Sequence, residues 1–199
     1  MDLWLATGNG HKMTEFKMLM NRVNVNFHSQ SEIPAFTAPP ETGKTFTDNA
    51  RIKVKALHSV KSDQWVMAED SGLVCNGLNG SPGIYSARYA GDKATDVENN
   101  LKVLQMMKIR SSENRAAHFV SVVIVRSPTG EEFVFEGELK GRISDAMRGT
   151  EGFGYDSIFI PEGEEKKTLA ELGQAHKNKV SHRAKAIQAM VEKLAPMWA

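Results

Sequence analysis

Apolar positions along the first sixty residues follow two different periods, and they predict a strand followed by two helices. Residues 3–6 are a short apolar run typical of a buried strand, and it stops at the glycine-containing segment 7–10. Residues 31–43 contain three prolines and predict an ordered loop, and a second helical pattern covers residues 45–60. The first helical pattern is formed by apolar side chains at Met13, Phe16, Leu19, Met20 and Val23.

The rest of the chain continues to alternate strand and helix patterns. Residues 65–68 predict a strand that runs directly into the acidic turn 69–72, and residues 76–92 are glycine-rich and irregular. The further predicted elements are a helix over 95–107, a hairpin of strands 117–126 and 131–139, a short strand over 157–160, and a last helix from about Ser181. This mixture predicts an α/β fold with a mixed sheet.

Composition narrows the class of protein. A chain of 199 residues with 41% hydrophobic and 25% charged residues can form one large domain or two closely joined lobes. Its net charge of +1 argues against a protein that coats a nucleic acid polymer. Cys75, the single cysteine, excludes an intramolecular disulfide and reads best as a buried apolar residue. The sequence contains neither a secretory signal pattern nor an apolar run that could span a membrane, so we expect a cytoplasmic protein.

The segment between the first strand and the first helix is a candidate phosphate site. Free backbone N–H groups and the positive end of the helix dipole favour an anion there. The spacing matches neither a Walker loop nor a dinucleotide-binding motif, and a plain turn capped by Asn9 or Thr7 is the alternative. The candidate residues are Thr7, Gly8, Asn9, Gly10, His11 and Lys12.

Acidic residues that follow the strand over 65–68 are candidates for binding Mg²⁺. Hard oxygen ligands suit this ion, which commonly bridges to substrate phosphates. Because side chains alternate along extended backbone, Glu69 and Asp70 should point to opposite sides, so only one of them should enter the site. Glu41 is a candidate second carboxylate, although an isolated acid is more often a solvated surface residue.

Two further segments could bind a nucleobase. In Gly152–Asp156, an aromatic ring lies between two glycines and is followed by a second ring and a carboxylate, which suits stacking and edge recognition. A glycine-rich turn is the alternative. In the basic segment 177–183, Ser181 can cap the last helix, and the planar fork of Arg183 suits a purine 6-oxo group. A basic surface patch is the alternative there.

Together these residues resemble the inosine triphosphate pyrophosphatase family, and the resemblance covers nearly the whole chain. Two departures stand out, namely Ser157 where the family usually has proline and Glu69 where aspartate is common. The ordered segments that carry the resemblance are 6–9 with Lys12, 41–43 with Phe46 and 49–50, 70–73, 82–89, 152–156, 167–168 with 170–171, and 181–183.

The resemblance implies a single domain over residues 1–199, elongated and two-lobed around a long mixed sheet, with the nucleotide in a cleft between the lobes. It also implies a homodimer that requires Mg²⁺. The implied reaction is hydrolysis of ITP, dITP or XTP to the monophosphate and pyrophosphate.

Within that reaction, each segment receives an expected role. Asp70 and Glu41 would hold Mg²⁺, Asp70 would act as general base, and Ser71 would contact the substrate beside the metal. Segment 7–12 with Lys53 and Lys177 would hold the phosphates. At the other end, Phe153 would stack on the base, with Gly154 and Tyr155 beside it. Asp156, His182 and Arg183 would read the edge of the base.

Three other functions remain open from the sequence. One is a pyrophosphatase of similar architecture that acts on modified pyrimidine nucleotides. The second is a nucleotide-binding module without catalysis. The third is a purely structural protein, in which the acidic turn and the basic helix end are solvated surface features.

Overall fold

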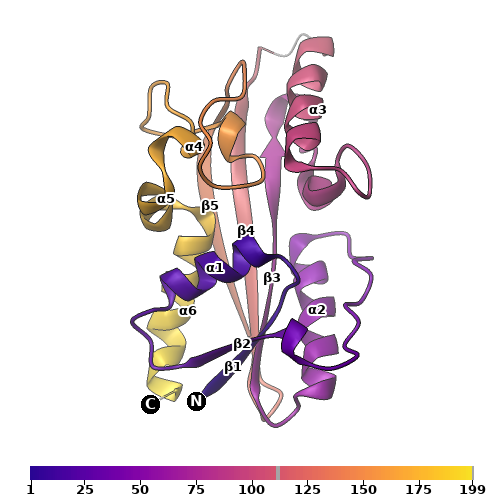
Figure 1. Ribbon diagram of the computed structural model, residues 1–199, viewed down its shortest axis with the longest axis vertical. Coiled ribbons are helices and arrows are strands. Elements are labelled where there is room, and N and C mark those ends of the chain that lie inside the picture. The colour runs from indigo at the N-terminus through magenta and orange to yellow at the C-terminus, as the bar shows by residue number, and fades with distance from the viewer. Residues whose placement is uncertain (111–112, 199) are drawn as a thin grey trace. The chain divides into compact units, whose positions relative to one another are not determined.

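The computed structural model, which describes residues 1–110 and 113–198, contains a six-stranded mixed sheet (Figure 1). Across the sheet the order is β2-β1-β3-β4-β5-β6; β1 pairs in parallel with β2 and β3, and β5 pairs antiparallel with β6. The predicted α/β class is therefore confirmed. The strands are β1 (Asp2–Ala6), β2 (Asn26–Ser29), β3 (Trp65–Cys75), β4 (Ala116–Arg126), β5 (Glu132–Ile143) and β6 (Phe159–Pro161).

Helix starts are set by side-chain caps. Thr45, Thr95 and Thr168 each accept a backbone N–H from the third helical residue, whose own carboxylate bonds back to the threonine N–H. Among the described residues, no helix is long and apolar enough to cross a membrane. The helices are α1 (Gly10–Leu19), α2 (Phe46–Val60), α3 (Asp96–Ile109), α4 (Leu169–Leu172), α5 (Gln174–Val180) and α6 (His182–Leu194), with short 3₁₀ turns that include Gly83–Arg88 and Asp156–Ile158.

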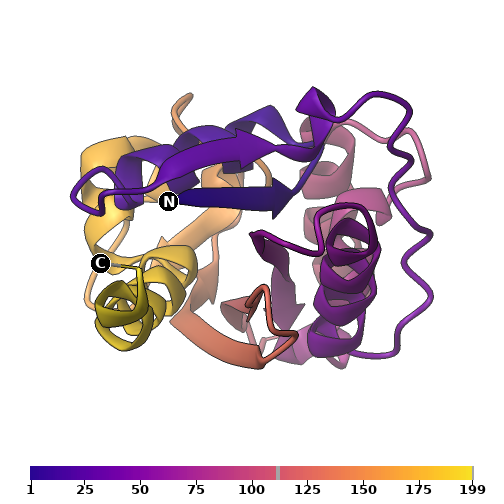
Figure 2. The ribbon, with the colours of Figure 1, turned by 90° about the horizontal axis from the view of Figure 1, so that it is seen from below.

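The chain forms two compact units, and the first consists of Met1–Asp70, Ser121–Gly137 and Arg183–Ala199. Its main apolar cluster joins Leu3 and Leu5 of β1 to Phe16 of α1 and Met190 of α6. The side chain of Trp4, which lies between Leu3 and Leu5 in β1, points to the other face of the sheet, as strand alternation requires. The ammonium of Lys61, the residue after α2, lies over its ring. Figure 2 accordingly shows α2 and α6 on opposite sides of this unit.

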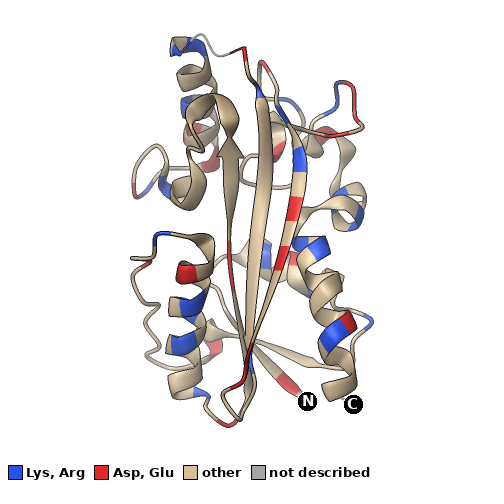
Figure 3. Ribbon diagram, turned by 180° about the vertical axis from the view of Figure 1, so that it is seen from behind, with Lys and Arg blue, Asp and Glu red and all other residues tan. Residues whose placement is uncertain are grey.

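The second unit consists of Ser71–Val120 and Glu138–His182. Its core packs Val103 and Met107 of α3 with Phe119 of β4, Ile143 of β5 and Phe159 of β6. Phe119 and Phe159 lie with ring centroids 4.6 Å apart, which ties β4 to β6. Residues of both charge signs are interspersed along the elements of each unit, in keeping with the net charge of +1 (Figure 3).

Several predicted boundaries are wrong. The strand expected over residues 65–68 continues to Cys75, so the expected acidic turn is mid-strand. The first helix ends at Leu19 rather than near residue 23, and the expected strand over 157–160 is a 3₁₀ turn followed by β6. The edge strand β2 and the short helices α4 and α5 lack a sustained apolar period, which is why the pattern did not reveal them.

Candidate active site

Asp70 lies in β3 and meets two side chains from α2. The ammonium of Lys53 lies 2.8 Å from Asp70 Oδ1, and the amide nitrogen of Asn49 lies 3.4 Å from Asp70 Oδ2. Asn49 and Lys53 are four residues apart, so they share one face of the helix. Each oxygen of Asp70 thus has one partner on α2, which fixes the orientation of the carboxylate. Asp70 is only 6% exposed.

Glu41 joins this cluster through the same lysine. Its Oε1 atom lies 3.0 Å from Lys53 Nζ, so one ammonium is shared by two carboxylates. The loop that carries Glu41 is tied to α2 because the Gly43 N–H donates to Asn49 Oδ1 at 2.8 Å. A Cβ at Gly43 would lie 2.6 Å from that Oδ1 atom, so this close approach requires glycine.

Burial and neighbouring charges shift the pKa values of Asp70 and Lys53 in opposite directions. Burial raises the pKa of Asp70, and the neighbouring ammonium of Lys53 offsets only part of that rise. Burial disfavours the charged form of Lys53, but Asp70 and Glu41 attract its proton strongly enough to hold its pKa above the ordinary value. The cluster thus contains a carboxylate with raised basicity beside a fixed positive charge.

Asp70 and Glu41 are the side chains of this cluster that could hold a hard cation such as Mg²⁺. Within residues 1–110 and 113–198, no group of three His, Cys, Asp or Glu side chains is placed to hold a metal ion. Asp70 and Glu41 could supply two oxygen ligands. Mg²⁺ commonly takes one or two protein carboxylates and completes its octahedron with water and substrate phosphates, so the donor set is chemically suitable.

Glu69 points away from Asp70, as strand alternation predicted, and that prediction is confirmed. It lies in a buried charge network in which its oxygens lie 2.7 Å from Arg183 Nη2 and 2.9 Å from Lys12 Nζ. Ser121 donates a hydrogen bond to it at 2.8 Å, and Arg183 also pairs with Glu15. Burial alone would raise the pKa of Glu69, but the charges of Arg183 and Lys12 hold it well below the ordinary range.

Arg183 lies in the first turn of α6, as the sequence predicts, but its side chain is buried. Its side chain is 1% exposed and is held between two carboxylates, rather than extended toward an open edge. These charges hold its pKa above the ordinary value despite burial. Its role in base recognition stays a prediction. Glu15, a buried acid inside the apolar stripe of α1, is a member of the network that the sequence did not reveal.

The predicted phosphate segment forms the exposed start of α1. Asn9 caps the helix, since its Oδ1 atom accepts the Lys12 N–H at 3.1 Å, and the Asn9 N–H bonds to Thr7 Oγ1 at the same distance. Gly8, Asn9, Gly10 and His11 are exposed. A Cβ at Gly10 would meet no atom within 4 Å, so the space beside this turn is open. Asn9 thus caps the helix, as expected for the alternative of a plain capped turn. The turn is also accessible to an anion.

A second cluster lies in the other unit and contains Phe153, Asp156 and Lys177. The ammonium of Lys177 lies 2.5 Å from Asp156 Oδ2 and 4.2 Å from the centroid of the Phe153 ring. The Phe153 N–H donates to the same carboxylate at 3.0 Å. Lys177, predicted as a phosphate ligand, is therefore a neighbour of the predicted base-stacking ring.

Three other predicted residues also lie in this unit. His182 is buried and stacks on Phe119 with centroids 4.8 Å apart. Tyr155 is buried, its hydroxyl donates to the Ser86 carbonyl at 2.7 Å, and burial raises its pKa. Ser71 follows Asp70 in β3 and is half-buried. Of these, Tyr155 acts inward, as an anchor for its loop.

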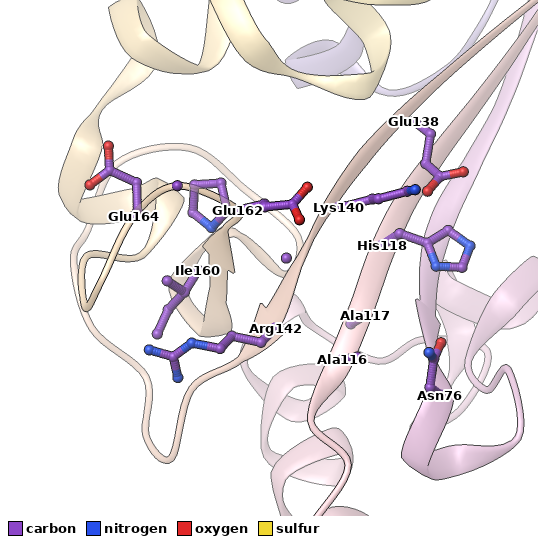
Figure 4. A pocket seen from close by; sticks show the side chains of 13 residues that line it. Asn76, Ala116, Ala117, His118, Glu138, Lys140, Arg142, Ile160, Glu162 and Glu164 are labelled. Atoms are coloured by element: carbon purple, nitrogen blue, oxygen red, sulfur yellow. The ribbon is translucent and has the colours of Figure 1, made fainter.

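The second unit also contains a pocket of about 500 Å³ that none of the predicted residues lines. Figure 4 shows His118 and the alternate β5 residues Glu138 and Lys140 on neighbouring strands, with Glu162 and Glu164 on the loop after β6. Its charges are mixed in sign, which does not suit a triphosphate. Paired acidic and basic side chains occur instead around Asp70, and we assign the candidate site there.

Comparisons with known proteins agree on one family. The model of the Ham1 family matches residues 3–193. A dITP/XTP pyrophosphatase of Bdellovibrio bacteriovorus is 54% identical over 195 residues, covering 98% of both chains. Among solved structures, a HAM1 protein from Coxiella burnetii superimposes with a TM-score of 0.89 at 33% identity, covering 98% of this chain and 99% of that one. The Ham1 protein of Staphylococcus aureus gives a TM-score of 0.87 at 37% identity, covering 99% and 100%.

Proposed function

Because this chain belongs to the Ham1 family, we propose that it is a nucleoside triphosphate pyrophosphatase that hydrolyses dITP, ITP and XTP. Water adds across the bond between the α- and β-phosphoryl groups, which yields the nucleoside monophosphate and pyrophosphate. The observation that carries the proposal is the cluster of the buried Asp70 with the half-buried Lys53 and Glu41, which could supply a carboxylate base and a positive charge for phosphate.

Asp70 is the proposed general base. A base for water must be ionised and yet retain affinity for a proton, and a buried carboxylate with a raised pKa beside an ammonium has both properties. Asn49 and Lys53 hold its two oxygens, so its orientation does not depend on the substrate. Lys53 would contact the phosphate oxygens where charge develops during the reaction.

Mg²⁺ is the proposed metal, with Asp70 and Glu41 as its protein ligands. When bound, this ion neutralises charge on a triphosphate. Ser71 is proposed to contact the substrate beside it. The exposed start of α1, from Thr7 to Lys12, is proposed to bind further phosphate oxygens. The Asn9 and Lys12 N–H groups are bonded within the turn, so other backbone N–H groups of the segment would make these contacts.

Base recognition is assigned to the cluster of the second unit. Phe153 offers a ring for stacking, while Asp156 and His182 offer polar groups for the edge of the base. Lys177 orients Asp156 through a buried ion pair, and this contact supports a role at the base end rather than at the phosphates. To recognise the base, the guanidinium of Arg183 would have to leave its ion pairs with Glu15 and Glu69 and bind the purine instead.

The wider properties are proposed in the same way. We expect a homodimer, which the molar mass in solution measured by light scattering tests directly. We also expect the enzyme to act in the cytoplasm, where nucleoside triphosphates are used.

A nucleotide panel tests the proposal. Pyrophosphate release should be rapid with ITP, dITP and XTP, should be slower by about 10² or more with ATP and GTP, and should disappear when a chelator removes Mg²⁺. Turnover of UTP or a methylated pyrimidine nucleotide above that of ITP would replace this function with the pyrimidine alternative.

A further inference from the structure

The loop Gly152–Asp156 has a backbone that needs support from outside itself. Gly152 and Gly154 have φ values of 80° and 61°, the left-handed region that glycine adopts readily, and two glycines leave a loop conformationally free. A Cβ at Gly152 would lie 2.1 Å from Asp156 Oδ2, so the loop folds tightly over that carboxylate. The position of the Phe153 ring therefore depends on what fixes the neighbouring peptides.

Two side chains of α3 bind both polar groups of Gly154. The Gly154 N–H donates to Asp96 Oδ2 at 2.6 Å, and the Gly154 carbonyl accepts from Asn100 Nδ2 at 2.7 Å. Asp96 and Asn100 are four residues apart, so they share one face of the helix. A rigid helix thus grips the residue that directly follows Phe153.

The helix side of this grip is itself well fixed. Asn100 is 1% exposed, and its amide also donates to the Asp96 carbonyl at 2.6 Å. Thr95 caps the helix with Glu98 in a reciprocal capping box, which fixes the turn that carries Asp96. Asp96 is exposed, so it can be replaced without opening the core.

From this geometry we infer that Asp96 and Asn100 are positioning residues that hold the Phe153 ring in place for a purine base. The inference rests on the proposed function, in which Phe153 stacks on the base. Neither side chain needs to touch the substrate. They act by removing the freedom of the loop before the nucleotide arrives, so they lower the ordering cost of binding.

Asp96 accepts a hydrogen bond from Gly154 and Asn100 donates one to it, so the two contacts can be removed by different substitutions. Position 96 must accept a hydrogen bond, which aspartate and asparagine both do, whereas alanine does not. Position 100 must donate one, so Asn100→Asp removes the donor and places a carboxylate against a carbonyl oxygen. The structure therefore predicts that Asp96→Asn is tolerated while Asp96→Ala and Asn100→Asp are not.

Steady-state kinetics with ITP test the inference. Asp96→Ala and Asn100→Asp should raise KM about tenfold and leave kcat within about threefold, because ground-state positioning is lost while the Asp70 cluster is intact. Asp96→Asn should restore the KM of the wild type. Asp92→Ala, which removes an exposed carboxylate just before α3, is the control and should match the wild type. An unchanged KM in both disruptive variants overturns the inference.

Hydrogen exchange separates this inference from the proposed function. In Asp96→Ala, the amides of residues 152–156 should exchange at least about tenfold faster than in Asp96→Asn, whatever the enzyme hydrolyses. Equal exchange in the two variants contradicts the positioning role even if Asn100→Asp fails to fold. A wild-type protein that hydrolyses no nucleotide of the panel, with the exchange difference present, contradicts the proposed function alone.

Discussion

Lys53 Nζ lies 2.8 Å from Asp70 Oδ1, and this ion pair joins the middle of α2 to the middle of β3. The same ammonium reaches Glu41, so a single lysine organises two carboxylates. Asp70 and Glu41 both carry hard oxygen donors, which are the ligands that a divalent cation such as Mg²⁺ takes.

Replacing Asp70 with asparagine should separate binding from catalysis. Asp70→Asn keeps the size of the side chain and removes the base, so hydrolysis of ITP should fall by about 10²–10⁴. Binding of ITP, measured by calorimetry, should persist. A variant that hydrolyses ITP at the rate of the wild type would eliminate Asp70 as the base.

Removing the charge of Lys53 should shift the pH dependence of the reaction. Lys53 lowers the pKa of Asp70 against the rise caused by burial, so Lys53→Met should raise that pKa further. A base works above its pKa, and the acidic limb of the kcat/KM profile should therefore move to higher pH, with a rate loss of about 10²–10³. Lys53→Arg keeps the charge and should move the limb much less. A limb that stays in place for Lys53→Met would mean that the limb belongs to another group.

Arg183→Ala should destabilise the protein strongly. The structure places this arginine between Glu15 and Glu69 in the interior of the first unit. Its removal leaves buried carboxylates without their partner and should cost about 3–5 kcal/mol, measured by denaturant unfolding. Lys193→Ala removes an exposed cation from the same helix and should cost little. A loss for Arg183→Ala as small as that control would contradict the role of the network.

Glu69 should make stability dependent on acidity. Its pKa in the folded state is held below the ordinary value, so its contribution is full above the unfolded pKa and is lost as pH falls toward the folded pKa. Glu69→Gln should be less stable than the wild type at pH 7, and the difference should narrow as the pH falls below about 4. Thermal melts across this range measure the difference, and a constant gap would contradict the linkage.

Phe153 should contribute binding energy through its ring. Phe153→Ala should weaken the binding of ITP by about 10- to 100-fold, since stacking of one base on an aromatic side chain is worth about 1–3 kcal/mol. Phe153→Tyr keeps the ring and should bind ITP nearly as well. Calorimetric titration with both variants gives the comparison, and equal affinities for alanine and tyrosine would remove Phe153 from the base site.

Local rules predicted part of the site from the sequence. The family resemblance is confirmed by the Ham1 match, and alternation along an extended strand correctly separated Glu69 from Asp70. The end of that strand was misplaced because the polar run from Glu69 to Gly72 was read as a turn. In the structure these acids stay in the strand because Lys12, Arg183 and Lys53 neutralise them.

Contacts between segments that are distant in the sequence could not be predicted from the pattern of apolar and polar residues. The approach of Glu41 to Lys53 depends on the Gly43–Asn49 hydrogen bond, and that of Lys177 to Phe153 depends on how α5 packs. Neither follows from a period or a spacing. Asn100 was likewise hidden, because a buried amide in a helix has no sequence signal until its partner, the Gly154 carbonyl, is known.

Product analysis with ITP tests the central claim most directly. Wild-type protein with Mg²⁺ should form inosine monophosphate and pyrophosphate in equal amounts, while Asp70→Asn should form both about 10²–10⁴ times more slowly. Formation of inosine diphosphate and free phosphate by the wild type would contradict the account, because it would place the hydrolysed bond between the β- and γ-phosphoryl groups.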